Sequence, residues 1–339
     1  MKIIRLLLFP LTIIYILITS IRNWMFDLGL IKTTSFRKPI IAVGNLSVGG
    51  TGKTPQIEYL IKLLNKHKLA VLSRGYGRAT KGFVLANESM NSQDIGDEPL
   101  QFFKKFKKIN VAVDENRVHG IQQLDKSDVI LLDDAFQHRK VTAGFYILLT
   151  KYNDLFTNDF VLPSGNLRER RVGVRRANVV VVTKCPQLIS IKGKEEVLML
   201  IRRYFNGPVF FSKIKYADFV VNGNGERILL KELSKYNILL VTGIANPRPL
   251  LTFLSEEQCN YKHLQFSDHH QFNDKEISTI KKQFELLENE QKIILTTEKD
   301  FTRLSSRLIP LFYLEIETSF VDKQDKFDSI ITTYVDGNL

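Results

Sequence analysis

The chain has 339 residues, more than one hydrophobic core usually supports, so two domains are expected. Hydrophobic residues make up 44% of the sequence and charged residues 25%, which excludes a disordered, collagen-like or fully membrane-embedded chain. Lys and Arg (48) exceed Asp and Glu (36), giving a net charge of +12 that indicates an anionic partner: a nucleic acid, a nucleotide or an acidic lipid surface.

An apolar run from Leu6 to Ile21 begins the chain, with Arg5 before it and Arg22 after it. Its roughly 16 residues would form a helix of about 24 Å, shorter than the hydrocarbon core of about 30 Å. The end of the run is also a poor signal-peptide cleavage site. We therefore predict that residues 1–30 form a membrane-associated helix, held in one leaflet by flanking basic residues, with a membrane span or a buried core helix as alternatives.

A glycine-rich loop follows the first predicted strand. Residues 39–43 are apolar and β-branched, as is typical of a buried strand, and residues 55–65 have a helical pattern. The loop between them ends in Gly-Lys-Thr at the start of the helix, which is the context that a phosphate-binding P-loop requires. Glycines allow backbone N–H groups to turn around phosphate oxygens, and the helix N-terminus adds its positive end.

The predicted ATP-binding residues are consecutive: Ser47, Val48, Gly49, Gly50, Thr51, Gly52, Lys53 and Thr54. Lys53 would reach the β- and γ-phosphates, and the Thr54 hydroxyl would bind Mg²⁺. Ser47 stands where the general P-loop pattern has its first glycine, but the remainder of the pattern is intact.

A second apolar run ends in two carboxylates, Asp133 and Asp134. At the carboxyl edge of a parallel sheet these side chains would lie beside the bound phosphates. Adjacent residues of a strand point to opposite faces, so both can ligate one ion only if the strand has already ended. We predict that at least one of them binds the metal, and a turn or helix-cap role remains the alternative for the other.

Further apolar runs, at residues 69–72, 145–149 and 179–183, alternate with helical patterns. This alternation predicts an α/β fold: a P-loop NTPase-like, doubly wound, mainly parallel sheet. Residues 31–208 are assigned to this nucleotide-binding and catalytic domain. A loop with two arginines and a tyrosine, residues 73–78, follows the first of these runs.

A smaller α/β domain is predicted after a hairpin. Residues 209–230 read as two strands around Asn222-Gly-Asn-Gly, a strong turn signal, and form the expected β-hairpin linker. Apolar strands at 237–241 and 292–296, with a helix capped at Asn273 between them, assign residues 231–339 to the second domain.

Short motifs along nearly the whole chain combine into one family pattern. They are Gly44 to Pro55, Ser73 to Arg78, Gly96-Asp97-Glu98-Pro99, Asp133 to Arg139, Leu162 to Gly165 with Leu167 to Glu169, Thr242 to Pro247, Phe266 to His269 and Thr297 to Asp300. In this order and spacing the chain resembles the tetraacyldisaccharide 4′-kinases, enzymes of the lipid A pathway in Gram-negative bacteria. Ala135 departs from the family, which usually has glycine there.

The resemblance implies phosphoryl transfer from ATP, with Mg²⁺, to the 4′-hydroxyl of a tetraacylated glucosamine disaccharide 1-phosphate. It further implies attachment to the cytoplasmic face of the inner membrane, where the partners are the lipid A precursor and an anionic membrane surface. Neither a nucleic acid nor an obligate protein partner is expected. The family's active site lies in a cleft between two α/β domains joined partly by a β-hairpin.

Roles for individual residues also come from the resemblance. Asp97 matches the proposed catalytic base, His269 matches the histidine that pairs with it, and Lys53 completes the catalytic set. Glu169 matches an acidic metal-binding position. The expected substrate contacts are Arg74, Tyr76, Arg78 and Arg117. Ordinary structural roles, as turn, cap or helix-surface residues, remain the alternative for Asp97, His269 and Arg117.

Other interpretations of the chain remain open. The arginine cluster at residues 168–176 has two readings, a clamp for phosphates or a solvated basic face, while the lysine run at 104–108 reads as solvated. A membrane-tethered P-loop switch ATPase that acts on a partner protein is the alternative function. Val48 argues against it, because many such proteins have a lysine at this position.

Overall fold

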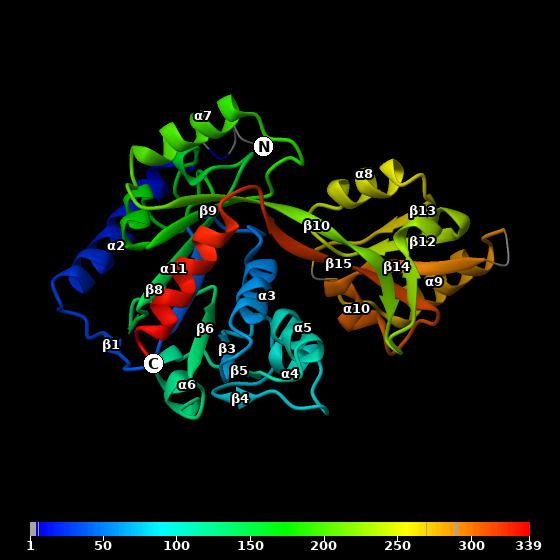
Figure 1. Ribbon diagram of the computed structural model, residues 1–339, viewed down its shortest axis with the longest axis horizontal. Coiled ribbons are helices and arrows are strands. Elements are labelled where there is room, and N and C mark those ends of the chain that lie inside the picture. Colours follow the sequence, from blue (N-terminus) through cyan, green and yellow to red (C-terminus); the bar gives the residue numbers. More distant parts are fainter. Residues whose placement is uncertain (1–4, 6, 269, 289–290) are drawn as a thin grey trace. The chain divides into compact units, whose positions relative to one another are not determined.

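The structure is a computed structural model that describes every residue except 1–4, 6, 269, 289 and 290. The chain divides into two compact units, Met1–Ile214 with Thr318–Leu339 and Lys215–Glu317. Two long strands, β10 (Val209–Asn222) and β15 (Leu311–Phe320), run from one unit into the other (Figure 1).

The first unit contains most of the regular structure. Its helices are α2 (Phe9–Asp27), α3 (Lys53–Leu63), α4 (Ser92–Ile95), α5 (Asp97–Lys105), α6 (Arg117–Gln123), α7 (Ile191–Arg202) and α11 (Gln324–Asp336), with 3₁₀ turns η1 (Phe156–Asn158) and η2 (Arg171–Arg176). Its strands are β1 (Thr34–Ser35), β2 (Ile40–Asn45), β3 (Leu69–Ser73), β4 (Val84–Leu85), β5 (Asn110–Val113), β6 (Val129–Asp133), β7 (Val141–Thr142), β8 (Phe145–Lys151) and β9 (Val179–Thr183).

The main sheet of this unit has the strand order β9-β8-β2-β6-β3-β5-β4. Every pairing between neighbours is parallel except that of β4 with β5. All residues of β2, β3, β6 and β9 are buried, which is the pattern of a parallel sheet covered by helices on both faces. The glycine-rich loop therefore leaves the middle of the sheet at its carboxyl edge, where parallel α/β sheets bind ligands.

Alternate residues of the strands face two different helical layers. Ile41 and Val43 pack in one cluster with residues of α3, α5 and α11, whereas Ile40 and Ala42 pack in another with Ile121 of α6. The period-two alternation of a strand thus fills both sides of the sheet. The predicted fold class, a doubly wound α/β sheet, is confirmed.

The second unit is a smaller parallel sheet of its own. Its strand order is β13-β12-β14-β15, all parallel, and β10 pairs with β11 in an antiparallel hairpin. The elements are β11 (Arg227–Leu229), η3 (Leu230–Lys235), β12 (Asn237–Thr242), α8 (Arg248–Glu256), β13 (Asn260–Gln265), α9 (Asp274–Glu285), β14 (Lys292–Thr297) and α10 (Glu298–Leu304). Apolar clusters on the two faces of the sheet include residues of α8 on one side and of α9 and α10 on the other.

The division of the chain differs from the predicted boundaries at its C-terminal end. Residues 318–339 belong to the first unit, although the sequence analysis placed them in the second domain. The reason is packing: Phe327, Ile331 and Val335 of α11 are fully buried in the core cluster that contains α3 and the main sheet. The N-terminal helix α2 lies within the predicted range 1–30 and extends to Asp27, past the end of the apolar run.

Candidate active site

The loop between β2 and α3 contains the predicted phosphate-binding residues. Gly49 (φ +95°) and Gly52 (φ +87°) have left-handed backbone conformations that residues with a Cβ rarely adopt. Ser47 and Thr51 are buried, whereas residues 48–50 are exposed. The loop is thus anchored at its ends and open at its tip, at the N-terminus of a helix, which is an arrangement suited to an anion.

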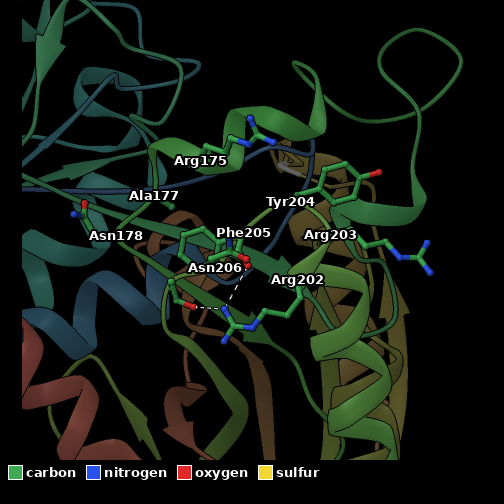
Figure 2. A pocket seen from close by; sticks show the side chains of 9 residues that line it. Arg175, Ala177, Asn178, Arg202, Arg203, Tyr204, Phe205 and Asn206 are labelled. Carbon is green, nitrogen blue, oxygen red and sulfur yellow. Dashed lines mark hydrogen bonds between the residues drawn. The ribbon is translucent and has the colours of Figure 1, made fainter.

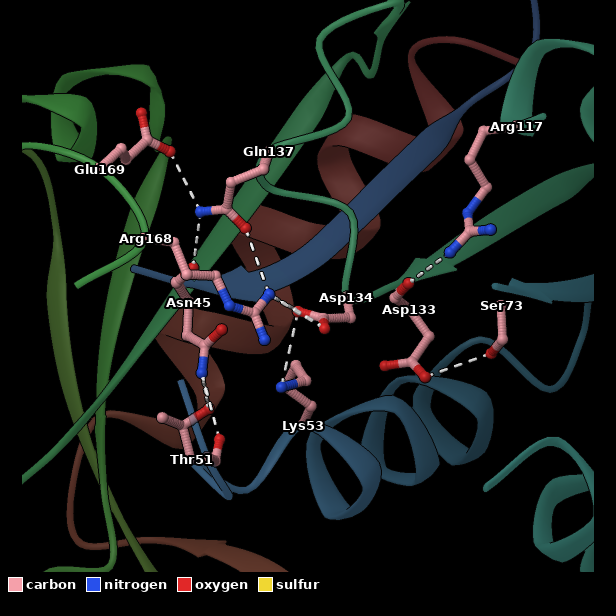
Figure 3. Close-up of polar contacts among 11 residues, drawn as sticks. Asn45, Thr51, Lys53, Ser73, Arg117, Asp133, Asp134, Gln137, Arg168 and Glu169 are labelled. Carbon is pink, nitrogen blue, oxygen red and sulfur yellow. Dashed lines mark hydrogen bonds and ion pairs between the residues drawn. The ribbon is translucent and has the colours of Figure 1, made fainter. Parts of the chain in front are cut away.

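Side chains from neighbouring strand ends hold this loop in place. Asn45 donates from Nδ2 to Oγ1 of Thr51 over 2.8 Å (Figure 3). The Thr183 hydroxyl donates to the Thr51 carbonyl over 2.7 Å. Lys184 donates from Nζ to the carbonyl of Gly50 over 2.8 Å. Burial, reinforced by neighbouring lysines, lowers the pKa of Lys184. Lys184 is thus a second lysine at the loop tip.

The two neighbouring carboxylates point in different directions. The strand β6 ends at Asp133, and Asp134 already has a left-handed backbone (φ +47°). Asp134 lies 3.5 Å from Nζ of Lys53 and accepts hydrogen bonds of 2.9 and 3.0 Å from Arg168. Asp133 instead accepts a hydrogen bond of 3.2 Å from the Ser73 hydroxyl. Figure 3 shows the two side chains diverging beside the start of α3.

The pKa values of Asp133 and Asp134 are shifted in opposite directions. Burial, and then the negative charge of Asp134, raises the pKa of Asp133 to about 6. For Asp134, burial also favours the neutral acid, but the charges of Lys53 and Arg168 outweigh it and hold its pKa below the ordinary value. Asp134 is therefore an anion between two cations, whereas Asp133 takes up a proton at a higher pH than an ordinary aspartate does.

The donor set at the end of β6 fits a magnesium ion that is also bound by nucleotide phosphates. Within the part of the chain that the structure describes, Oδ1 of Asp133 is buried and has no hydrogen-bond partner. The described residues contain no group of three or more His, Cys, Asp and Glu side chains able to hold a metal by themselves. A hard cation with carboxylate, hydroxyl and phosphate oxygens as ligands satisfies both observations.

Glu169 lies in a hydrogen-bonded network at the same end of the sheet. Its side chain is buried, and Oε1 accepts from Nε2 of Gln137 over 3.0 Å and from Arg176 over 2.7 Å. The other oxygen, Oε2, accepts from Nδ2 of Asn23 over 2.8 Å. Gln137 also donates to the Asn45 carbonyl over 2.9 Å, so this network is attached to the strand that leads into the phosphate loop.

The predicted base, Asp97, is the first residue of α5 and follows Gly96, whose backbone is left-handed (φ +90°). It is 8% exposed and lies at the buried start of a helix, whereas the sequence left a simple turn role as the alternative to a catalytic base. Burial and the charge of Asp134 are the larger causes of the raised pKa of Asp133, and the negative charge of Glu98, the residue after Asp97, adds to them. His269 lies outside the described residues, and its pairing with Asp97 stays a prediction.

The four predicted substrate contacts divide into two kinds. Arg74 and Tyr76 expose their side chains, with Tyr76 81% exposed. Arg78 is instead paired with Glu115. Arg117 is 3% exposed and donates to backbone carbonyls that follow β5 and end β6. Arg74 and Tyr76 are thus exposed, while Arg78 and Arg117 hold the surrounding loops, and contact of these four residues with a substrate stays a prediction.

The arginine cluster at 168–176 disperses in the folded chain. Arg168 and Arg176 contact the carboxylates described above, and Arg171 donates to a backbone carbonyl. Arg175 lines a separate pocket of about 380 Å³ together with residues 202–207 (Figure 2). The cluster is therefore neither one clamp nor one solvated face.

Some polar residues of the site were not singled out from the sequence. They are Asn45, Ser73, Gln137 and Lys184. Each lies within a few residues of the carboxyl end of a parallel strand, and that position was the signal available in the sequence.

Comparisons with known proteins agree on one family. Residues 4–336 match the sequence profile described as tetraacyldisaccharide-1-P 4′-kinase. The chain is 51% identical to the tetraacyldisaccharide 4′-kinase of Flavobacterium johnsoniae, with 100% of this chain and 99% of the relative covered. It is 44% identical to that of Bacteroides thetaiotaomicron, at 98% and 93% coverage. The crystal structure of LpxK from Aquifex aeolicus in complex with ATP superposes with a TM-score of 0.79 at 28% identity, covering 98% of this chain and 99% of the other.

Proposed function

The chain belongs to the tetraacyldisaccharide-1-P 4′-kinase family, and from this premise we propose that it phosphorylates the 4′-hydroxyl of a tetraacylated glucosamine disaccharide 1-phosphate with ATP. The observation that carries the proposal is the contact of Lys53 and Arg168 with Asp134, directly beside the open phosphate loop. A cation pair at a helix N-terminus is suited to stabilising the negative charge of a phosphoryl group during its transfer.

Binding of the nucleotide rests on residues 47–54. The backbone N–H groups of the open tip would surround the phosphates, and Lys53 would exchange its contact with Asp134 for the β- and γ-phosphates. Thr54, the Asp133–Asp134 pair and Glu169 are the residues that would hold Mg²⁺. When bound, the ion neutralises the charge that develops on the transferred group.

The acceptor hydroxyl needs a base because it loses its proton as the new P–O bond forms. Asp97 accepts that proton in this proposal, while the bond from the γ-phosphorus to ADP breaks and ADP leaves with the electron pair. His269 would orient the Asp97 carboxylate. The buried position of Asp97 at the start of α5 supports this assignment.

The helix α2 supplies the membrane attachment in this proposal. It is long and apolar enough to cross a bilayer, and it exposes large apolar side chains along its length. These are Phe9, Leu11, Ile13, Ile14, Leu17, Ile18, Ile21 and Trp24. A substrate with four acyl chains leaves a bilayer only at great cost, about 0.8 kcal/mol for each methylene, so the enzyme must reach it at the surface. We assign this to the cytoplasmic face of the inner membrane, where anionic lipids attract the net charge of +12.

The proposal is tested by incubating the purified full chain with MgATP and the tetraacyl disaccharide 1-phosphate in mixed micelles. A lipid bisphosphate is expected, and a Lys53→Ala variant should form at least a hundredfold less because it lacks the phosphate-binding cation. ATP consumption without any lipid product would instead favour the switch ATPase.

A further inference from the structure

The helix α2 has a second, polar side that joins it to the candidate active site. Thr12 is 1% exposed, in contrast to most of the large apolar side chains of the helix. The Thr12 hydroxyl donates to Ser164 over 2.7 Å, and the Tyr15 hydroxyl donates to the Arg168 carbonyl over 3.2 Å. The helix is therefore packed on the segment that carries the site residues, rather than being an independent anchor.

The contact nearest the chemistry is made by Asn23. Its Nδ2 donates to Oε2 of Glu169 over 2.8 Å. Its own carbonyl accepts from Arg139 over 2.7 Å, which fixes the helix backbone at this position. Arg22, the preceding residue, donates to the carbonyl of Gln137 over 3.0 Å. One turn of α2 thus contacts Glu169 and the residue that binds the other oxygen of Glu169.

The carboxylate of Glu169 has little freedom around this contact. A Cβ placed on Gly173 would lie 2.8 Å from Oε2, so the glycine makes room for the oxygen that Asn23 binds. Gln137 and Arg176 occupy Oε1. The only donor that the structure gives to Oε2 among the described residues comes from α2.

We propose that Asn23 is a positioning residue that orients Glu169 for metal binding, and that it couples the membrane-facing helix to the nucleotide end of the sheet. The inference rests on the proposed function, in which Glu169 helps to hold Mg²⁺. Groups that orient a metal ligand commonly affect metal affinity by about 10- to 100-fold, although they never touch the ion. The contact between α2 and Oε2 of Glu169 is thus made by a single side-chain amide.

The test uses the full chain in detergent micelles. Binding of Mn²⁺ together with a non-hydrolysable ATP analogue is measured from the Mn²⁺ EPR signal. Asn23→Leu keeps the branched shape of the side chain, although leucine is larger, and it makes the helix more apolar, so vesicle binding should be equal to or stronger than that of the wild type. We expect its dissociation constant for the Mn²⁺–nucleotide complex to rise about tenfold. Asp27→Asn, one turn further along α2, removes an exposed ion pair with Arg139 and should stay within twofold of the wild type.

A parallel Glu169→Gln variant distinguishes an error in the role of Asn23 from an error in the metal role of Glu169. If Glu169→Gln weakens Mn²⁺ binding while Asn23→Leu leaves it unchanged, the inference is overturned and the assignment of Glu169 stands. If Glu169→Gln binds Mn²⁺ like the wild type, the metal role of Glu169 and the positioning role of Asn23 are both overturned. Lipid phosphorylation still tests the kinase function by itself. An equal loss in Asp27→Asn would show that helix docking in general, and not the Asn23 amide, controls the site.

Discussion

The two adjacent aspartates illustrate how one backbone angle assigns different roles to identical side chains. The left-handed conformation of Asp134 ends the strand and turns its carboxylate toward Lys53 and Arg168, whereas Asp133 keeps the direction set by β6. The pKa of Asp133 is raised to about 6 and that of Asp134 is lowered. The sequence predicted a metal site at this pair but left the direction of each side chain open.

We expect Asp134→Asn to have opposite effects on ATP affinity in the absence and in the presence of Mg²⁺. Without Mg²⁺ the variant should bind ATP as tightly as the wild type or more tightly, because a carboxylate that competes with phosphate for Lys53 is gone. With Mg²⁺ its affinity should be at least tenfold lower than that of the wild type. Titration calorimetry with and without Mg²⁺ measures both, and an equal loss in the two conditions would rule out a metal role.

Asp97→Ala should lower kcat by about 10²- to 10⁴-fold, which is the usual contribution of a general base. ATP affinity should change less than threefold, because the proposed role of Asp97 concerns the acceptor hydroxyl. Single-turnover kinetics and equilibrium nucleotide binding on the same preparation provide the comparison. Matching losses in turnover and in ATP binding would contradict the assignment.

His138 gives the first unit a pH-dependent stability. Burial, and then the charges of Arg117 and Arg74, lowers its pKa from 6.5 to about 4. Between these values the unfolded chain binds a proton that the folded chain does not, so stability is fully present above pH 6.5 and falls as the pH decreases toward 4. The contribution lost between pH 7.5 and pH 5 is about 2 kcal/mol.

Urea unfolding at pH 7.5 and pH 5 checks this sign and size. A His138→Asn variant should lose about 2 kcal/mol less than the wild type between the two pH values. The same pH dependence in both proteins would mean that other groups account for it.

At the scale of elements, a buried ion pair connects the helix of the phosphate loop to the helix of the proposed base. Glu58 of α3 is 3% exposed and accepts hydrogen bonds of 2.8 Å from both Gln101 and Lys105 of α5. These two residues lie one and two turns after Asp97, on the same side of α5. The pair thereby fixes where α5 begins relative to Lys53.

We expect Glu58→Ala to lower the free energy of unfolding by about 3 kcal/mol, because it removes the buried carboxylate that pairs with the half-buried Lys105. The double variant Glu58→Leu/Lys105→Met should regain most of this stability, since apolar residues replace a buried ion pair well. Its kcat should stay reduced if the pair positions Asp97. Full recovery of kcat in the double variant would limit the pair to a stabilising role.

Helices and strands were largely predictable where a short stretch of sequence determines them. The buried strands β2, β3, β6, β8 and β9 follow from continuous apolar runs, and the capping box of α9 at Asn273 was visible in the sequence. The polar stripe of α2 was missed, because Thr12, Tyr15 and Asn23 are scattered in an apolar run and align only at helical spacing.

At the scale of the whole chain, the prediction failed where the deciding contacts are distant in sequence. Residues 318–339 return to the first unit because α11 completes its core, and no local pattern in Phe327 or Ile331 indicates which core they join. The candidate site shows the same limit. The loop and the carboxylates were found from motifs, but the contacts of Asn23 with Glu169 and of Lys184 with the loop depend on the folded chain.

In the proposed reaction, the γ-phosphate of ATP is transferred to the 4′-oxygen of the lipid. The direct measurement supplies the full chain with ATP radiolabelled in its γ-phosphate and the tetraacyl disaccharide 1-phosphate, and counts ADP and labelled lipid together. One labelled lipid is expected for each ADP, with the new phosphate on the 4′-oxygen by NMR. ADP formed with unlabelled lipid, or label on any other oxygen of the sugar, would contradict it.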